Sequence, residues 1–382
     1  MIISLQLSSL ITLLGVTTAL TLTLLLWFSR GENQQVNRYL SLILALSSLL
    51  ASTMVLNVEG IIASHQGSTI FALQLALGPL LYFYACKLTQ RDFRWQKKHY
   101  WHLLPALLAA LIWQLQLSSL PIDEFFSSTI ESRNLLNQSR FWHRITTFIS
   151  VPVYAIAVLR LLSPYQAHIK ERCSAIDEVN LNWLKTLSYG FLFGALAATL
   201  LEIHAHFTDQ SSPSPGSIYS LPPLLLSLFL GVFGIQQQHI CDEEKPKAES
   251  NSEADVNQGR KYQTSSLSPE GAVEIWNQLQ QLMSTNKPYL EHGLKISGLA
   301  QQLQVSTSHL SETINGHAKQ SFYEFINQQR VEEAKRQLAD ASLKHLSGAD
   351  IGFQSGFNSN STFFTHFKKY QQQTPQQYRK QV

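Results

Sequence analysis

Seven long apolar stretches are the feature that most constrains how this chain folds. Each is about 20 residues long, the length a helix needs to cross a hydrocarbon layer about 30 Å thick at about 1.5 Å per residue. The first is too long for the apolar part of a signal peptide and lacks a preceding basic region, so we interpret it as an anchor. We therefore expect a seven-helix transmembrane bundle over residues 1–240, with spans at 4–28, 39–58, 69–88, 101–120, 141–162, 183–205 and 218–239.

The charges between these stretches predict how the bundle is oriented. If the C-terminus lies inside, the inner loops carry ten Lys and Arg residues, whereas the outer loops carry Arg133 and Arg140. Basic residues are retained on the cytoplasmic side of a membrane. The chain is thus predicted to be a multi-pass protein of the cell (inner) membrane with a cytoplasmic C-terminal domain. Cys86, Cys173 and Cys241 then lie at or near the reducing side, and their wide spacing predicts neither a disulfide nor a zinc site.

Ionisable residues cluster near the predicted outer ends of several spans. Charged groups inside a bilayer are costly and often mark the path of a ligand or an ion. Residues at a wetted helix end cost little, so an ordinary interfacial position is the alternative interpretation. The candidate sensing residues for an unidentified signal ligand are Glu59, His143, Arg144, Glu202 and His204, with His65 and His206 nearby.

The composition changes sharply after the last apolar stretch. Residues 241–268 are rich in charged and small polar side chains, which predicts a flexible cytoplasmic linker because such a segment buries too little surface to order itself. Residues 269–285 regain helical spacing through Val273, Trp276 and Leu279. This connector helix has three interpretations: a link between membrane motion and the last domain, a self-association face, or a cap on the last domain's core.

Residues 286–382 form the last predicted domain. They contain eleven Lys and Arg residues against seven Asp and Glu residues, a formal charge of +4. This mild basic bias fits a polyanionic partner, and an ordinary solvated surface fits it equally well.

Local signals predict a first helix-turn-helix unit in this domain. A short apolar-faced helix begins at Ile296, the chain turns at Gln304-Val305, and Ser306 is a good N-cap for a second helix. That helix buries Leu310 and Ile314 and is expected to end near Gly316. In a DNA major groove its outward row would meet the base edges. The row consists of Ser308, Ser311, Glu312 and Asn315.

A second unit follows a longer helix that starts near Ser321. Its first helix is expected to end near Gly356, and Ser359 is the predicted N-cap of its second helix. The core side of that second helix is predicted to hold Phe363, Phe364, Phe367 and Tyr370. Hydroxyl groups suit base contacts and lysines suit phosphate contacts, although a solvated face would look similar. The opposite side carries Ser361, Thr365, Lys368 and Lys369.

Three runs in this domain resemble the DNA-binding domain of the AraC/XylS family of bacterial transcription regulators. They are "KISGLAQQLQVSTSHLSETING", "FINQQRVEEAKRQL" and "DIGFQSGFNSNSTFFTHFKKYQQQTPQQYR", and the resemblance extends from about Lys287 to Gln381. It implies two helix-turn-helix motifs, joined by a long helix, with recognition helices in successive major grooves. Carried over position by position, it implies base-reading roles for Ser308, Ser311, Glu312, Asn360, Ser361 and Thr365.

The sequence departs from the family pattern at two positions. Gly348 stands where a branched apolar residue usually opens the second unit, and Gln372 stands where a glycine usually precedes Thr-Pro. The first change is expected to cost up to about 1 kcal/mol of helix propensity. The second is expected to strain the turn, so the second unit is predicted to be the looser one.

The membrane half resembles the seven-span N-terminal region of membrane-bound AraC-type regulators, chiefly in residues 77–108, "LGPLLYFYACKL…FRW…HYWHLLPALL". Together the resemblances imply an all-α, membrane-integral, one-component transcription regulator that binds specific DNA in response to a sensed cue. The alternative is a membrane carrier or lipid-handling protein whose C-terminal helical domain docks other proteins. The predicted partners are double-stranded DNA, membrane lipid, RNA polymerase, a second copy of the chain and the signal ligand. Neither a cofactor, a metal site nor an enzyme activity is expected.

Overall fold

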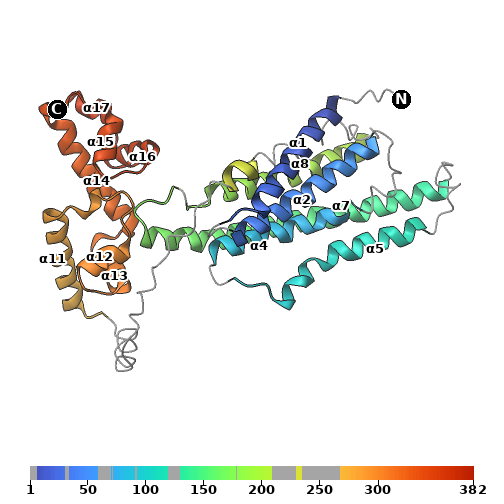
Figure 1. The fold of residues 1–382 in the computed structure, drawn as a ribbon, viewed down its shortest axis with the longest axis horizontal. Coiled ribbons are helices and arrows are strands. Elements are labelled where there is room, and N and C mark those ends of the chain that lie inside the picture. Colours follow the sequence, from blue (N-terminus) through green and yellow to red (C-terminus); the bar gives the residue numbers. More distant parts are fainter. Residues whose placement is uncertain are drawn as a thin grey trace. The chain divides into compact units, whose positions relative to one another are not determined.

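The computed structural model describes residues 7–30, 34–58, 70, 72–90, 93–118, 130–177, 179–208, 229–234 and 267–382. All the named elements in these residues are helices (Figure 1), which confirms the all-α class for the described part of the chain. The chain divides into two compact units. The first contains residues 1–163 and 181–239, and the second contains residues 164–180 and 240–382.

Named helices of the first unit coincide with six of the seven predicted spans, and several of them extend beyond the span. They are α1 (Leu7–Trp27), α2 (Gln34–Val58), α4 (Leu77–Thr89) preceded by the 3-10 turn η1 (Ala72–Ala76), α5 (Leu104–Ser118) preceded by η2 (Lys97–His102), α7 (Ile130–Arg172) and α8 (Asn182–Thr208). Residues 229–234 are helical within the seventh predicted span. Helix α7 begins in the first unit, and its residues from Pro164 onward belong to the second.

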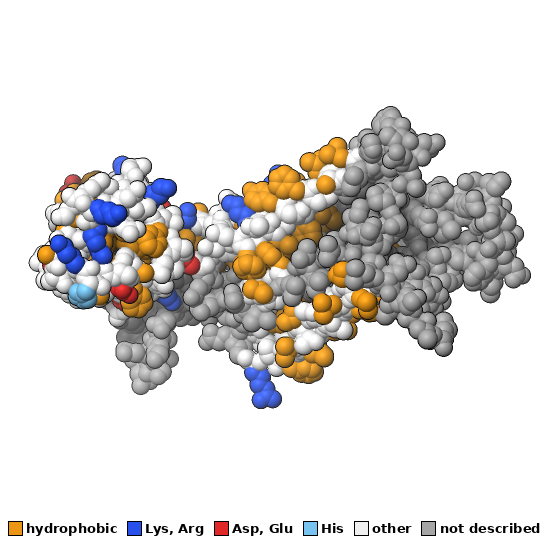
Figure 2. All heavy atoms as spheres, turned by 90° about the horizontal axis from the view of Figure 1, so that it is seen from above, with side chains coloured by type: hydrophobic (Ala, Val, Ile, Leu, Met, Phe, Trp, Pro, Cys, Tyr) orange, Lys and Arg blue, Asp and Glu red, His pale blue; other side chains and the backbone are white. Residues whose placement is uncertain are grey.

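Two of these helices are long and apolar enough to cross a membrane by length and composition. They are Ser9–Trp27 within α1 and Gln34–Thr53 within α2. Over the described residues, the other predicted spans do not meet this criterion of length and composition. A core helix or a signal sequence can have the same properties, so the seven-span bundle stays a prediction. Hydrophobic side chains nevertheless gather on the face of the molecule that Figure 2 shows. Exposed large apolar residues of this unit include Leu24 of α1, Leu111 of α5 and Phe193 of α8.

A close helix approach organises the region around α4. A Cβ atom on Gly78 would lie 2.8 Å from the ring of Tyr154, so this glycine lets α4 and α7 come together. The Tyr154 hydroxyl lies 2.8 Å from Nδ1 of His102, which fixes the end of η2 against α7.

The second unit contains seven α-helices in its described residues beyond 266. They are α11 (Pro269–Thr285), α12 (Ile296–Gln302), α13 (Thr307–Ala318), α14 (Phe322–Ala339), α15 (Gly348–Gln354), α16 (Asn360–Gln371) and α17 (Pro375–Arg379). Two hydrophobic cores share the long helix α14. The first core contains Leu310 and Phe322, whereas the second contains Val331, Phe363 and Phe367.

Helix α11 packs on the first of these cores. Its residues Ile275, Leu279 and Met283 are buried there, and the Trp276 ring stacks on His317 of α13 at a centroid distance of 5.2 Å. Of the three interpretations of the connector helix, the structure supports the cap on the domain core.

The predicted turns and caps are largely confirmed, because they depend on local chemistry. Gln304 adopts φ 56°, the left-handed conformation that turns the chain between α12 and α13. Ser306 and Ser359 cap α13 and α16 with side-chain oxygens that accept from backbone N–H groups. The predicted end of α13 at Gly316 is wrong: the helix continues to Ala318, and Lys319 at φ 56° makes the C-terminal turn.

The two departures in the second unit have different consequences. Gly348 is the first residue of α15, where Ser347 and Asp350 form a capping box, so its low helix propensity matters less than in a helix interior. Gln372 adopts φ 56° at the end of α16, the left-handed conformation for which glycine is usual. The expected strain therefore lies at Gln372.

Two sequence expectations are corrected. Phe364 is not in the core but 42% exposed, because α16 turns a narrower face inward, which buries His366 instead. Cys173 is disulfide-bonded, which contradicts the expectation of three unpaired cysteines, whereas Cys86 is free and buried.

Other predictions fall outside what the structure describes. The linker 241–268 lies outside the described residues except for its last two. Glu59 and His65 also lie outside them. The backbones of His143 and Arg144 belong to α7 and those of Glu202, His204 and His206 to α8, but their side chains are not described.

Candidate nucleic-acid interface

The outward face of α13 carries the polar row predicted for the first recognition helix. Ser308, Glu312 and Asn315 are exposed, and Ser311 is half-buried. Leu310 and Ile314 on the opposite side are fully buried. The helix is thus oriented with its apolar side in the core and its hydrogen-bonding side outward, which is the arrangement that base reading requires.

The outward face of α16 is similar in kind. Its core side buries Phe363 and Phe367, and His366 lies 3.0 Å from the Tyr323 hydroxyl through Nε2. Burial lowers the pKa of His366 below its ordinary value. All five predicted contact residues on this helix are exposed: Asn360, Ser361, Thr365, Lys368 and Lys369.

The two lysines of α16 differ in their surroundings. Lys369 donates from Nζ to Glu324 Oε2 at 2.6 Å, and its ammonium lies 5.3 Å from the centre of the Tyr370 ring. Burial alone would raise the pKa of Glu324, but hydrogen bonds from Lys369 and Tyr370 outweigh it and lower that pKa. Lys369 therefore ties α16 to α14.

A buried arginine at the centre of the unit was not anticipated from the sequence. Arg330 of α14 is 1% exposed and donates to Tyr289 O at 2.7 Å, Glu291 O at 2.7 Å and Asn327 Oδ1 at 3.2 Å. Burial lowers its pKa to about 10. Gly356, at φ 96°, leaves room for this network, since a Cβ there would lie 3.0 Å from the Arg330 Nε. The arginine thus joins η3 (Pro288–Leu290), α14 and the turn between α15 and α16.

Residues 164–180 belong to the same unit and also contact Arg330. Ser174 accepts from Arg330 Nη1 through its carbonyl oxygen at 3.1 Å and from Nη2 through Oγ at 3.0 Å. Its backbone N–H donates to Leu294 O at 3.1 Å, beside an antiparallel bridge between Cys173 and Lys295. Ser174 is 1% exposed.

Two carboxylates of this segment reach the predicted recognition helices. Glu171 Oε2 accepts from Ser311 Oγ and from Asn315 Nδ2, both at 3.0 Å. Asp177 Oδ2 accepts from Ser359 Oγ at 2.8 Å and from Thr362 Oγ1 at 2.6 Å. No local sequence pattern predicts these contacts, because they join residues 140 or more positions apart.

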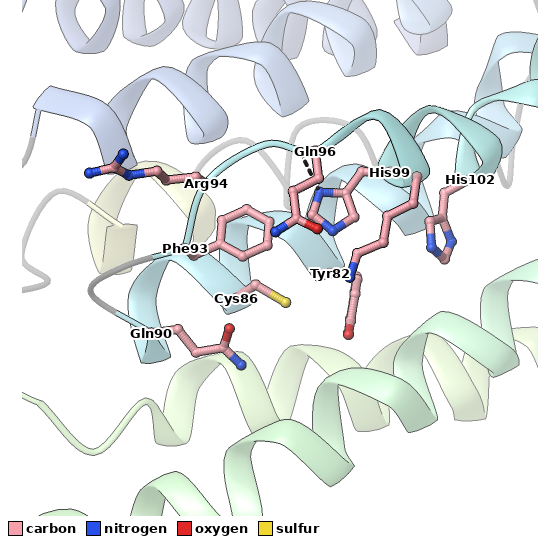
Figure 3. A pocket seen from close by; sticks show the side chains of 9 residues that line it. Tyr82, Cys86, Gln90, Phe93, Arg94, Gln96, His99 and His102 are labelled. Atoms are coloured by element: carbon pink, nitrogen blue, oxygen red, sulfur yellow. Dashed lines mark hydrogen bonds between the residues drawn. The ribbon is translucent and has the colours of Figure 1, made fainter.

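The first unit has a pocket of its own, with a volume of about 720 Å³, beside the end of α4 (Figure 3). Its wall includes the cationic side chains of Arg94 and Lys98 together with Phe93 and Tyr82. Burial, with Lys98 adding to it, lowers the pKa of His99, whose Nδ1 accepts from the Gln96 backbone N–H at 3.1 Å. Such a wall is suited to an anionic group that also has an apolar part.

Comparison with known proteins supports a helix-turn-helix assignment for the second unit. Residues 299–381 match a family described as "Helix-turn-helix domain", and these residues include α13 and α16. The chain therefore carries a helix-turn-helix domain near its C-terminus.

Relatives with curated descriptions match the same end of the chain. An uncharacterised HTH-type transcriptional regulator of Staphylococcus aureus (strain COL) is 34% identical over 91 residues, which are 24% of this chain and 12% of the relative. The transcriptional regulatory protein HptR of Staphylococcus aureus (strain NCTC 8325 / PS 47) is 31% identical over 104 residues, 27% of this chain and 40% of the relative. The match thus spans about an eighth of the first relative and two fifths of the second.

A solved structure, described as a protein of unknown function from Listeria innocua, matches 28% of this chain and 94% of its own at 24% identity. The TM-score of this match is 0.24.

Proposed function

We propose that this protein is a membrane-integral, one-component transcription regulator that binds specific double-stranded DNA through both helix-turn-helix units. The observation that carries the proposal is the pair of capped helices, α13 and α16, that bury their apolar sides and turn hydrogen-bonding side chains outward. The helix-turn-helix match and the two transcriptional regulators among the relatives support it.

In this proposal Ser308, Ser311 and Glu312 read bases from α13, and Asn360, Ser361 and Thr365 read them from α16. Lys368 contacts a phosphate. Lys369 already pairs with Glu324, so a phosphate contact is a secondary role for it. RNA polymerase and a second copy of the chain are further proposed partners. The similarity of the relatives supports the helix-turn-helix assignment, whereas the residue roles and the further partners are proposed for this chain only.

The membrane part of the proposal rests on the first unit. Three observations favour a seven-span bundle with a cytoplasmic second unit. Helices α1 and α2 are apolar, leucines and phenylalanines of α1, α5 and α8 are exposed, and the basic residues are concentrated in the predicted inner loops. Such a bundle would sense a lipid-borne or external cue by binding it differently in two states. Labelling of single introduced cysteines from either side of the membrane tests this topology.

DNA capture by the full-length protein in lipid nanodiscs tests the DNA-binding part. The protein is incubated with a randomised pool of double-stranded DNA at two salt concentrations, and the retained DNA is sequenced. We expect an enriched sequence motif whose binding weakens about a thousandfold between about 50 and 200 mM salt if about six phosphates are contacted. A carrier or lipid-handling protein with a docking domain would retain DNA with no motif and little salt dependence.

A further inference from the structure

The predicted reading face of α13 and the N-terminal end of α16 each hold an acidic partner from elsewhere in the chain. We call residues 171–177 the latch. Glu171 engages Ser311 and Asn315 of α13, and Asp177 engages Ser359 and Thr362 at the start of α16. From this geometry we infer that the latch is an intramolecular ligand of the two recognition helices, and that it and DNA compete for them. The inference rests on the proposed function, since it describes how the same faces are regulated.

The chemistry of the two contacts resembles that of a bound phosphodiester. Each carboxylate accepts two hydrogen bonds from uncharged donors, as a phosphate oxygen does when it meets Ser, Thr and Asn side chains. Asp177 also lies where the 12-residue helix α16 begins, and the partial positive charge of a helix N-terminus favours an anion there. A donor that is engaged by the latch is not available to DNA.

The charge of the latch adds to this competition. A DNA backbone approaching α13 and α16 would meet two carboxylates at the sites of closest contact, and like charges repel. On α13 the outer residues remain accessible, since Glu171, Ser308 and Glu312 line a groove of about 360 Å³ that also includes His168 and Arg172. The latch thus obstructs the faces without filling the space above them.

The latch is anchored by contacts that leave the reading faces untouched. Ser174 lies between the two carboxylates in sequence and is held by Arg330, by Asn327 Nδ2 at 3.3 Å and by Leu294 O. Cys173 and Ile176, on either side of Ser174, are buried, and Cys173 is also disulfide-bonded. One short segment therefore places two acids on two different helices.

The latch also has a direct covalent route to the first unit. Glu171 and Arg172 are the last residues of α7, a continuous helix that begins at Ile130 in the first unit. A shift or rotation of α7 on ligand binding would move Glu171 with it, because a helix transmits motion along its axis more faithfully than a flexible linker does. The regulation would then act through α7, in addition to any action through residues 241–268.

Hydrogen exchange on the unmodified, full-length protein in nanodiscs tests the latch. The probe is the duplex enriched from the randomised pool. If DNA displaces the latch, exchange at the Ser174 amide, which donates to Leu294 O, accelerates at saturating DNA, by about tenfold for a latch that is closed about nine-tenths of the time in the free protein. A Ser174 amide that stays protected in the DNA complex overturns the inference.

Affinity measurements on variants give a second, independent test. If the latch is closed about nine-tenths of the time, the double variant Glu171→Ala, Asp177→Ala binds the enriched duplex about tenfold more tightly than the unmodified protein. The matched control is Glu270→Gln, Glu274→Gln, which removes two exposed acids from α11 of the same unit. An equal gain in the control would show a bulk charge effect and overturn the latch.

The outcomes separate this inference from the function on which it rests. If the unmodified protein and the double variant enrich the same motif with equal affinity, the DNA-binding proposal stands and the latch is refuted. If neither enriches any motif, both proposals fail. If only the double variant enriches a motif, both are supported.

Discussion

The first helix-turn-helix unit packs against an additional helix, α11, which contributes Ile275, Leu279 and Met283 to its core. The second unit has a smaller apolar core and polar contacts to α14. These polar contacts are the Lys369–Glu324 ion pair, the Tyr370–Glu324 hydrogen bond and the contact between His366 and Tyr323. The difference indicates that the same motif can be held by burial in one copy and by a mixture of burial and polar contacts in the other. We therefore expect the second unit to be more sensitive to single substitutions and to pH.

The largest expected effect is at Phe363, which is fully buried in the smaller core against Phe357, Phe367 and Gly352. Phe363→Ala should cost about 3–5 kcal/mol through lost burial and the cavity left behind. The neighbouring, partly exposed Phe364 is the matched control, and Phe364→Ala should cost about 1 kcal/mol or less.

Amide hydrogen exchange in α16 and α13 measures these two variants. Phe363→Ala should raise exchange in α16 much more than in α13. Equal loss of protection in both helices would mean that the two units unfold as one and would remove the distinction between them.

The helix C-termini provide a smaller effect that compares the units directly. Lys319 ends α13 and Gln372 ends α16, both in the left-handed conformation that costs a non-glycine residue about 1–2 kcal/mol. Lys319→Gly should stabilise its unit by about 1 kcal/mol after the entropy of glycine is included. Gln372→Gly should gain less, because the Gln372 side chain donates from Nε2 to Lys369 O at 2.9 Å and that bond is lost.

Thermal unfolding of the detergent-solubilised protein, together with local hydrogen exchange, measures both glycine variants. A loss of stability in either one would show that its side chain contributes more than the backbone strain costs. A larger gain at Gln372 than at Lys319 would contradict this expectation and show that the hydrogen bond from Gln372 to Lys369 O adds little stability.

The smallest expected effect concerns acid sensitivity. Although burial opposes it, hydrogen bonds from Lys369 and Tyr370 hold the pKa of Glu324 below its ordinary value of 4.5. A lowered folded-state pKa contributes stability above the unfolded-state pKa, and this contribution is lost as the pH falls through the folded-state value. Protection in α16, measured as the exchange rate relative to the intrinsic rate at the same pH, should therefore weaken on acidification from about pH 6 to about pH 4 and below, by an amount typical of a partly exposed pair, about 1 kcal/mol or less.

The variant Glu324→Gln isolates this contribution from the other carboxylates of the unit. It should lose part of the pH dependence in α16 and leave that of α13 unchanged. An identical pH profile in the variant and the unmodified protein would show that the ion pair adds no stability.

Much of the second unit could be predicted from the sequence because its signals are local. The caps at Ser306 and Ser359 and the turn at Gln304 depend on residues within one helical turn, and the apolar spacing fixes which side of α13 is buried. The prediction that Phe364 is buried is wrong because periodicity alone does not show how wide the buried arc of a helix is. Four aromatic residues fall in one arc of α16, and Phe364 lies at its exposed edge.

The central polar network and the latch could not be predicted in this way. Arg330 lies on a helix whose pattern is largely polar, so nothing local marks it as buried rather than solvated. Glu171 and Asp177 lie more than 130 residues before their partners, and their contacts depend on tertiary structure. In the first unit, apolar length predicts where helices occur, but not which side chains form a ligand site.

Selection of DNA by reading-face variants of the full-length protein tests the central claim most directly. Ser311→Ala and Thr365→Ala are each compared with the unmodified protein by sequencing the duplexes retained from the randomised pool. Because the two side chains lie on different recognition helices, we expect each variant to relax a different half of the enriched motif, at a cost of about 1–3 kcal/mol per lost base contact. Lys368→Ala is the control and should weaken binding to all duplexes alike. An unchanged motif in both reading-face variants would contradict the claim that α13 and α16 read DNA.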